Sequence, residues 1–427
     1  MRPIGDVAGP SGDRWSGNLA DFETDRLAFM LRMRDEFGGL VRFDSRTTIV
    51  NDPHLAAEIL LDRKKSFAIR ENFRGETLTR DQIAETKWLR PALNPGLRRG
   101  RAGAITDDVV SSLSAELLAA SGAPVDPLPL LERVSAHSVA RFFFGSDAAR
   151  VVDPARELLL ALDRVFGNVF SLPAGWPTPS RRRIRKAHHA LERVLLPLLL
   201  SRADDARAPQ DDVATRVVQA LGSREGSPSV ERMAQMLIGA LLAAQRVPAA
   251  GAAWMLYEVA QDPGLQERLR GEATRYAGVA SSGRTPEARG YPLAMAVVLE
   301  SLRLHPPTWL LHRTLLRDEL IGSYAAPRGH HLLISPYVLH RDETHFENPG
   351  TFSAVRWNSR HPPPAAFMPF GRGLHGCPGS EVGTAMLVAI LLTTVDIYAV
   401  ELRGGAVTAD PRSTLVPVGL TLGLTPR

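Results

Sequence analysis

The chain has 427 residues, 44% hydrophobic and 23% charged, a composition that excludes a disordered or fibrous protein. Its formal net charge is +5, spread along the chain and matched by 46 acidic residues, so we expect no nucleic-acid partner. No uninterrupted apolar run approaches the ~18 residues of a membrane span, and the polar N-terminus carries no signal-peptide pattern. We therefore expect a cytoplasmic protein with no membrane partner.

Hydrophobic periodicity and helix-stop residues predict a mainly helical chain with a minor β portion. We expect a short helix over 52–61, capped by Asp52, and a long helix over 180–202, capped by Ser180. The other predicted helices cover 105–118, 130–144, 154–166, 229–260, 293–304 and 381–395. Strands are predicted at 41–44, 47–50, 398–402 and 415–424, and within 310–335. We find no repeat or low-complexity linker and expect one domain over residues 1–427.

The single cysteine, Cys377, lies in a glycine-rich segment, FGRGLHGCPG, at positions 370–379. Glycines are expected where the backbone approaches another group closely or takes a positive φ. Cys377 comes just before a predicted helix, whose first amide groups lower the pKa of a thiol and favour the thiolate. A thiolate can bind a soft metal or haem iron, and no partner ligands for zinc stand at a usable spacing.

This segment resembles the haem-binding loop of the cytochrome P450 family. Phe370, Gly373, Cys377 and Gly379 match the positions of the family motif, and His375 stands where the family carries a basic residue facing a haem propionate. The resemblance, to soluble bacterial members in particular, implies the cytochrome P450 fold. It also implies haem b (iron protoporphyrin IX) as the cofactor, with Cys377 as the axial metal ligand.

Further motifs of the same family stand upstream. Glu300 and Arg303, three residues apart on a predicted helix, resemble the buried Glu-x-x-Arg pair that holds the core beneath the haem. Arg313 matches a strand arginine that binds a propionate. At the position of Thr351 the family usually has an arginine that completes a network with the Glu-x-x-Arg pair, and Arg356 is a candidate to replace it.

The predicted helix over 229–260 is apolar almost all round and should run through the core. By resemblance it passes over the distal face of the haem, where the pocket lining would be Ala243, Ala244, Gln245, Arg246 and Val247. The family typically has an acid and then a hydroxyl here, which deliver protons to oxygen bound on iron. This chain has Arg246, Val247 and Pro248 instead, and neither arginine nor valine releases a proton at useful pH.

Arg246 and Gln245 are the candidate catalytic residues, and several interpretations of Arg246 stay open. It could anchor a carboxylate-bearing substrate, as in fatty-acid peroxygenases of the superfamily, which carry an Arg–Pro pair in this helix and use hydrogen peroxide. The enzyme could use O₂, with a substrate hydroxyl or ordered waters replacing the relay. It could also couple, cyclise, dehydrate or rearrange its substrate without inserting oxygen. Finally, Arg246 could point away and pair with a nearby acid.

The predicted function is a haem-thiolate oxidoreductase, in the first place a monooxygenase, acting on a small organic molecule such as a natural-product intermediate. A monooxygenase of this length implies a separate ferredoxin or flavodoxin as electron donor. We expect segments 69–85 and 165–176 to form the roof of the pocket. Gln82 and Thr86 replace residues that face the propionates in the family, and the candidate substitutes are Lys87, Trp88 and Arg90. A non-catalytic haem protein is the less favoured class.

Overall fold

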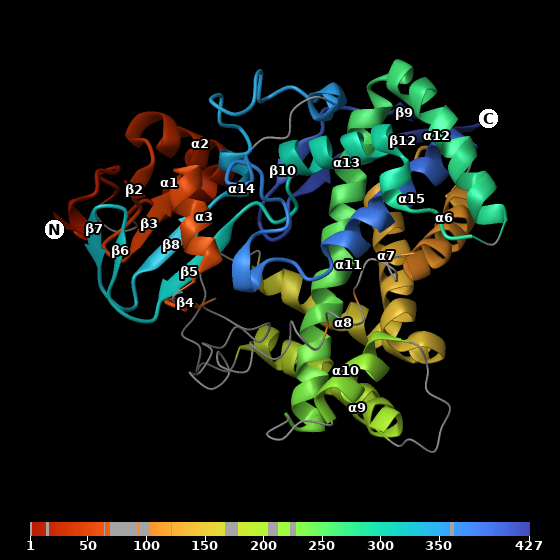
Figure 1. Cartoon of the computed structure of the whole chain (residues 1–427), viewed down its shortest axis with the longest axis horizontal. Coiled ribbons are helices and arrows are strands. Elements are labelled where there is room, and N and C mark those ends of the chain that lie inside the picture. The colour runs from red at the N-terminus through yellow and green to blue at the C-terminus, as the bar shows by residue number, and fades with distance from the viewer. Residues whose placement is uncertain are drawn as a thin grey trace. The chain divides into compact units, whose positions relative to one another are not determined.

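The computed structural model describes residues 2–13, 17–63, 65–68, 93, 97, 103–120, 122–166, 178–203, 212–222, 228–282, 284–358 and 363–427 (Figure 1). The chain forms two compact units. Unit 1 comprises residues 1–84 and 302–377, and unit 2 comprises residues 85–301 and 378–427. Most of the described elements are helices, which confirms the predicted fold class of mainly α with a minor β portion.

Unit 1 contains both larger sheets. The five-stranded sheet has the order β2 (Leu40–Arg42), β3 (Thr47–Val50), β8 (His331–Ile334), β5 (Leu311–Leu315), β4 (Phe67–Ala68). Strands β3 and β8 are parallel, and the other neighbours are antiparallel. A three-stranded sheet has the order β1 (Arg2–Pro3), β7 (Tyr324–Ala326), β6 (Glu319–Ile321). Along β8 buried and half-buried residues alternate, as expected for a strand with one face in the core.

The helices of unit 1 are α1 (Leu19–Thr24), α2 (Arg26–Phe37), α3 (Pro53–Leu61) and α14 (Pro336–Leu339), with short 3₁₀ turns η1 (Ile4–Asp6), η5 (Ala354–Trp357) and η6 (Gly373–His375). The Asp52 side chain accepts a hydrogen bond from the Leu55 amide (2.7 Å), which confirms the predicted cap of α3. The apolar face of α3, including Leu60, packs in one core cluster with Leu332 of β8 and Met368. This packing places the C-terminal end of α3 beside the functional loop described below.

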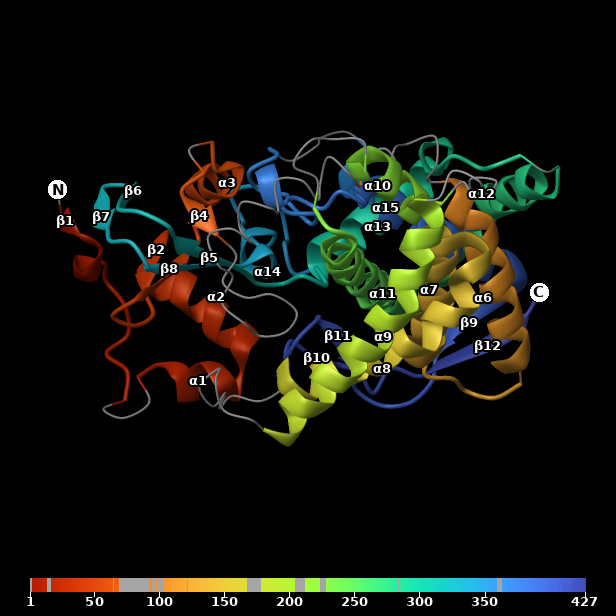
Figure 2. The same cartoon turned by 90° about the horizontal axis from the view of Figure 1, so that it is seen from below.

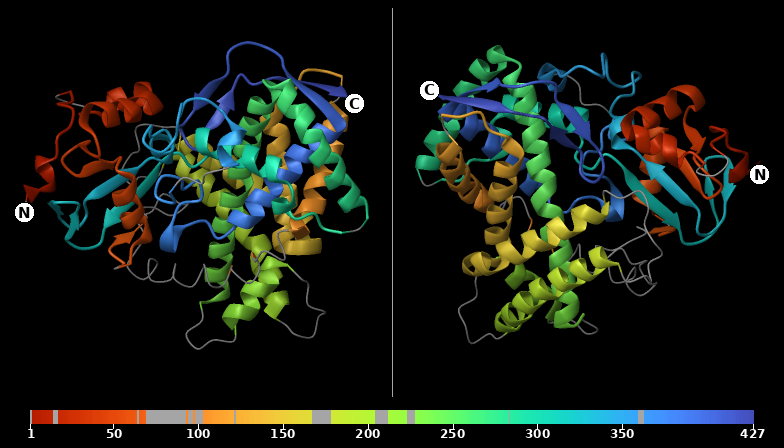
Figure 3. Two further views of the ribbon diagram at one scale, coloured as in Figure 1. Left: turned by 45° about the horizontal axis from the view of Figure 1, so that its top comes forward. Right: turned by 180° about the vertical axis from the view of Figure 1, so that it is seen from behind.

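Unit 2 is built around the 31-residue helix α11 (Val230–Ala260). Its other elements are α6 (Thr106–Ala120), α7 (Pro127–Phe144), α8 (Ala148–Phe166), α9 (Pro179–Ala203), α10 (Val213–Gly222), α12 (Pro263–Ser281), α15 (Ser380–Ile397), and the turns η2 (Gly103–Ile105), η3 (Gly145–Asp147) and η4 (Ala288–Gly290). Helix α11 packs against α7, α9 and α15, and α8 crosses it (Figure 3). Its buried residues include Leu237, Leu241 and Trp254, as the apolar pattern predicts. Helix α13 (Pro292–Leu304) contains the boundary between the units.

Two antiparallel strand pairs complete unit 2: β9 (Tyr398–Leu402) with β12 (Leu422–Pro426), and β10 (Thr408–Asp410) with β11 (Val416–Val418) (Figure 2). The single strand expected over 415–424 is wrong, because β11 and β12 have different partners. Gly419, whose φ is +81°, lies between them and lets the chain turn.

Two predicted helix starts are also wrong. Helix α8 begins at Ala148, and Pro154 lies inside it at the cost of one backbone hydrogen bond. Helix α9 begins at Pro179, where the Thr178 hydroxyl, rather than that of Ser180, accepts a hydrogen bond from the Arg181 amide (3.2 Å). In contrast, the cap predicted for α11 is confirmed, since the Ser229 side chain accepts from the Arg232 amide.

By length and mean hydropathy, α11 and α15 would each be able to cross a membrane. Within the most apolar window of each helix, 61% and 67% of the residues are buried inside the protein. The interior helix of a globular protein meets the same criteria, so this finding is weak support for a span.

Replacing Gln266 by leucine should lower the free energy of unfolding by about 1–3 kcal/mol. The Gln266 amide donates to the Val259 carbonyl (3.0 Å) and the Val400 carbonyl (2.7 Å), and it accepts from the Val400 amide (3.0 Å). The Gln266 side chain therefore joins α12 to β9 through two hydrogen bonds with the Val400 backbone. Urea unfolding checks the effect, with Gln261→Leu, at the exposed C-terminal cap of α11, as the control. Equal stability of the two variants would contradict this role.

Candidate functional site

The Cys377 residue is exposed at the end of unit 1, so it is not the buried hydrophobe that a lone cysteine often is. The loop before it folds back on itself: the Cys377 amide donates to the Phe370 carbonyl (2.7 Å), and the Gly376 amide donates to the Gly373 carbonyl (3.1 Å). Helix α15 begins three residues later, after Gly379 at its N-terminal cap. These bonds fix the backbone that leads up to the thiol, which itself remains accessible.

Gly373 is the position where the loop meets the end of α3. Its φ is +67°, and a Cβ atom there would lie 2.2 Å from the Leu60 carbonyl oxygen and 2.7 Å from the Leu61 Cα. Only glycine fits such a contact with backbone atoms. The next two residues of η6 are Leu374, which is exposed, and His375, which is half-buried.

Arg313 is a buried cation in the same unit. It lies in β5 opposite Leu332, and it is only 4% exposed. One of its Nη atoms donates to the His312 carbonyl (2.8 Å), while its Nε–H has no hydrogen-bond partner among the described residues. Burial lowers the pKa of the Arg313 guanidinium to about 10, and the nearby Asp62 carboxylate opposes that shift.

Asp62 connects Arg313 with the loop. It follows the last residue of α3 with a φ of +41°, and its carboxylate accepts from the amides of Ser66 (2.6 Å) and Phe67 (3.3 Å). Burial raises the pKa of Asp62, and these hydrogen bonds and Arg313 counteract the increase. The end of α3 thus touches the Cys377 loop through Leu60 and faces Arg313 through Asp62.

These residues fit a haem. A buried guanidinium with an unpartnered N–H suits an anionic group such as a propionate, and an accessible thiol on an amide-braced loop suits iron. Cys377 would hold the iron, and Arg313 and His375 would take the propionates. The structure therefore places Phe370, Gly373, His375 and Cys377 on one loop, while Arg313 faces the end of α3 that this loop contacts.

The Glu300 and Arg303 side chains are both fully buried on α13. Arg303 donates to three backbone carbonyls, those of His340 (3.0 Å), Pro349 (2.7 Å) and Thr351 (3.1 Å). Where the family usually has an arginine side chain, the carbonyl of Thr351 therefore joins the network.

Arg356 approaches the same network through an aromatic ring. The guanidinium carbons of Arg303 and Arg356 lie 5.2 Å and 6.0 Å from the Phe346 ring centroid. Arg356 also donates to the Glu347 carbonyl (2.8 Å). The Phe346 ring thus provides a favourable surface for both guanidinium groups.

Sequence reasoning gave His340 no role, although its place before Arg341 and Asp342 was a signal. The His340 ring is fully buried; its Nδ1 lies 3.2 Å from the Arg303 carbonyl, and its Nε2 accepts from the Met368 amide (3.0 Å). These partners require the neutral tautomer with hydrogen on Nδ1. Burial lowers the pKa of His340 to about 3. The ring thus ties the end of α13 to the segment that leads into the Cys377 loop.

The predicted distal residues belong to unit 2 and lie on two faces of α11. Ala243 is exposed, and Ala244 and Val247 are half-buried, whereas Gln245 is only 2% exposed. Positions 243 and 247 share a face because they are four residues apart, and position 245 lies on the opposite face.

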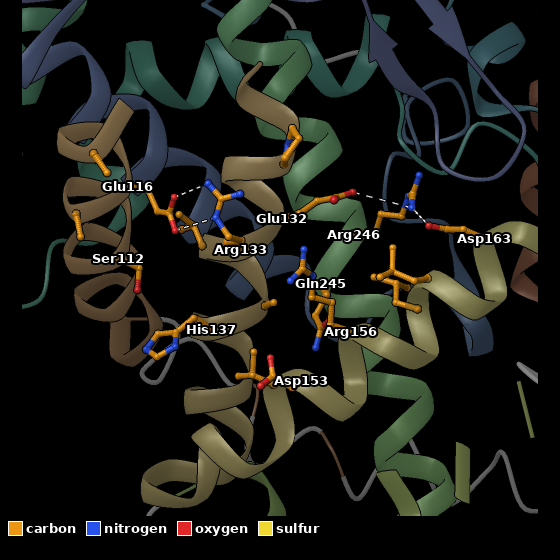
Figure 4. Close-up of a pocket in the computed structure, with 18 residues that line it drawn as sticks. Ser112, Glu116, Glu132, Arg133, His137, Asp153, Arg156, Asp163, Gln245 and Arg246 are labelled. Carbon is orange, nitrogen blue, oxygen red and sulfur yellow. Dashed lines mark hydrogen bonds and ion pairs between the residues drawn. The ribbon is translucent and has the colours of Figure 1, made fainter. Parts of the chain in front are cut away.

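Arg246 forms an ion pair with Asp163 of α8, and one of its Nη atoms lies 4.0 Å from a carboxylate oxygen of Glu132 on α7. Figure 4 shows the two acids on either side of the guanidinium. The structure thus shows the arrangement in which Arg246 pairs with a nearby acid. Gln245 and Arg246 line a cavity of about 510 Å³ formed by α6, α7, α8 and α11. The remaining candidates, Gln82, Thr86, Lys87, Trp88, Arg90 and the side chains of segments 69–85 and 165–176, lie outside the described residues.

Gly373→Ala should destabilise the protein by at least about 2 kcal/mol more than Gly371→Ala and should reduce haem retention. Both glycines have φ near +65°, so both variants carry a similar backbone strain of about 1–2 kcal/mol. At position 371 the nearest atom to a new Cβ is 3.8 Å away, whereas at 373 it would overlap the Leu60 carbonyl. Parallel denaturant titrations measure the difference; equal losses would show that the loop does not press on α3.

Folding stability should fall below neutral pH because His340 must stay neutral in the native state. Its native pKa, about 3, lies below the ordinary value of 6.5, so this contribution is complete above pH 6.5 and declines as the pH falls toward 3. The expected loss from His340 alone is about 2 kcal/mol between about pH 7.5 and about pH 5. Denaturant unfolding at both pH values checks this. His340→Gln should be less stable but should lose less on acidification; an identical loss would refute the assignment.

Comparison with known proteins agrees with this geometry. The chain is 24% identical over 310 residues to lanosterol 14-alpha demethylase of Cunninghamella elegans, covering 66% of this chain and 60% of that protein. It is 26% identical over 326 residues to cyclooctatin synthase of Streptomyces melanosporofaciens, covering 72% and 69%. With abscisic acid 8'-hydroxylase 4 of Arabidopsis thaliana it shares 27% over 239 residues, covering 55% and 51%. This chain spans 60% of the length of the Cunninghamella elegans enzyme and 50% of the length of lanosterol 14-alpha demethylase of Macaca fascicularis.

The fold also has a solved counterpart. A zebra fish cytochrome P450 structure with progesterone superposes with a TM-score of 0.79 at 18% identity, covering 94% of this chain and 99% of that one. The predicted cytochrome P450 fold is thereby confirmed. The family model for cytochrome P450 matches residues 8–421, nearly the whole chain. This chain therefore belongs to the cytochrome P450 family.

Proposed function

We propose that the protein is a haem-thiolate monooxygenase that oxidises a small organic molecule, with haem b as its cofactor. The observation that carries the proposal is the accessible Cys377 thiol on a loop braced by its own amides and by the end of α3. The unpartnered N–H of the buried Arg313 supports it, because it offers a donor to an anionic cofactor group. When bound, the haem supplies the oxidising chemistry, and the thiolate ligand favours cleavage of an O–O bond.

The protein's own residues hold and orient that group. Cys377 binds the iron, and Arg313 and His375 neutralise the propionates. Arg303 and His340 keep the segment before the loop in place through the backbone carbonyls and the amide they bind. Ala243 and Val247, on one face of α11, leave room for substrate because their side chains are small.

Proton delivery in this proposal does not use side chains 246–248. Arginine holds its proton, and valine and proline have none to give. Arg246 is already engaged by Asp163, so a substrate carboxylate would have to displace an existing partner. This pairing favours the use of O₂, with ordered water or a substrate hydroxyl as the proton donor, over carboxylate anchoring and a peroxygenase reaction.

The relatives are named for the demethylation of lanosterol, the hydroxylation of abscisic acid and the synthesis of cyclooctatin, all small organic molecules. We extend this to a natural-product intermediate as the substrate and to the cytoplasm as the location. A separate ferredoxin or flavodoxin supplies electrons, and basic residues near Cys377, such as Arg372, suit an acidic partner.

The test uses protein reconstituted with hemin. The wild type should show the visible spectrum of a thiolate-ligated haem, and Cys377→Ala should lose it, while Leu374→Ala, an exposed neighbour in the same loop, should keep it. Turnover of a candidate substrate with a reductase system and O₂, but not with hydrogen peroxide alone, is the expected activity. An unchanged spectrum in Cys377→Ala would refute the haem-thiolate assignment, and turnover with peroxide alone would replace the monooxygenase by a peroxygenase.

A further inference from the structure

The cavity beside α11 is lined by many charged side chains. Its lining, shown in Figure 4, belongs entirely to unit 2, whereas Cys377 belongs to unit 1. Besides short apolar side chains, it contains four carboxylates and three guanidinium groups, those of Glu116, Glu132, Asp153, Asp163, Arg133, Arg156 and Arg246. Which of these charges is already neutralised decides what the cavity can bind.

Two acids are directly paired. Arg133 donates to both carboxylate oxygens of Glu116, at 2.9 Å and 2.6 Å, and Arg246 forms its ion pair with Asp163. Such charge-assisted bonds satisfy both members of a pair.

Two further charges of the lining are exposed to solvent. Asp153 and Arg156 are both exposed and lie three residues apart on α8, so they share a face and offset one another in solvent. The lining therefore has one carboxylate more than it has guanidinium groups, and Glu132 and Asp163 share the single charge of Arg246.

Glu132 is held in a setting that favours a cation. Its side chain is 34% exposed, and its carboxylate forms only a long ion pair with Arg246, at 4.0 Å, which is beyond hydrogen-bond distance. Burial raises the pKa of Glu132, and Arg246 and Arg156 only partly oppose that increase. The charge of Arg246 also acts on Asp410 of β10, where it helps to lower the pKa of that carboxyl. A cation that contacted Glu132 would thus find a carboxylate that its surroundings leave under-compensated.

Gln245 gives the independent sign of a ligand. The residue lines the cavity and is only 2% exposed. Neither the nitrogen nor the oxygen of its side-chain amide has a hydrogen-bond partner among the described residues. A buried polar group without a partner costs about 1–3 kcal/mol. The amide oxygen is an acceptor for an N–H group, as is the carboxylate of Glu132.

We infer that this cavity is a binding site for a small organic cation with N–H donors on a short alkyl chain, such as an alkylguanidinium. Glu132 provides the opposite charge, the Gln245 amide provides a second acceptor, and Ala115, Val134 and Leu159 provide the apolar wall. An anion is disfavoured, because the excess charge of the lining is negative. This inference goes beyond the proposed function, since it concerns residues of unit 2 and requires neither iron nor oxygen.

Binding is measured on the hemin-reconstituted protein by isothermal titration calorimetry with butylguanidinium, pentanamide and pentanoate. These probes have chains of similar length and carry positive, zero and negative charge. Butylguanidinium should bind at least about tenfold more tightly than either of the others. Its delocalised cation has no lone pair for iron, so the visible spectrum should not change. Tightest binding of pentanoate, equal binding of all three, or a spectral shift with butylguanidinium would overturn the proposal.

Variants locate the site. Glu132→Gln, which is nearly isosteric, should weaken butylguanidinium about tenfold or more, and Gln245→Leu should weaken it several-fold. Glu157→Gln is the control, because it removes the same charge from an exposed position of α8 outside the cavity lining. A melting temperature for each variant establishes that it is folded. Unchanged binding in folded Glu132→Gln would refute the site. If Cys377→Ala loses the haem spectrum but still binds butylguanidinium, the two proposals are separated.

Discussion

The buried guanidinium of Arg303 is the constraint on which unit 1 depends. A full positive charge with no solvent access is tolerated only if its N–H groups meet acceptors. Three carbonyls from the segment between His340 and Thr351 do so, and the His340 ring returns a bond to the Arg303 carbonyl. That segment otherwise has little regular structure, so the arginine determines its course. The His340 ring in turn accepts a hydrogen bond from the Met368 amide, and this bond fixes the backbone nine residues before Cys377.

The end of α3 provides the second support of the loop. Gly373 adopts a left-handed conformation and makes a close contact with Leu60. Asp62, two residues after Leu60, also has a positive φ although it is not a glycine. Such strained positions persist only where surrounding contacts fix them. Here the contacts are the amides of Ser66 and Phe67, which hold the Asp62 carboxylate near Arg313. Strain in the backbone and burial of charge therefore occur together at the end of α3, which contacts the Cys377 loop.

The sequence was sufficient where a signal is local. The cap and first turn of α3, the length of α11 and the loop around Cys377 depend on neighbouring residues, and each was predicted. The direction of Arg246 was not decided, because its partner Asp163 lies 83 positions earlier and only packing of α8 on α11 brings them together. The role of the Thr351 carbonyl could not be predicted either, because every residue type has the same backbone carbonyl. The start of α8 was missed because, in the sequence, a proline inside a helix looks the same as a proline in its first turn.

The pairing of Arg246 has a consequence for redesign. The one cation at positions 243–248 of the long helix is held by an aspartate from a neighbouring helix, with a glutamate close by. An engineer who wants the enzyme to accept acidic compounds would gain little by adding arginines at that place. The first step is to neutralise Asp163, which would release a guanidinium that the scaffold already holds in position.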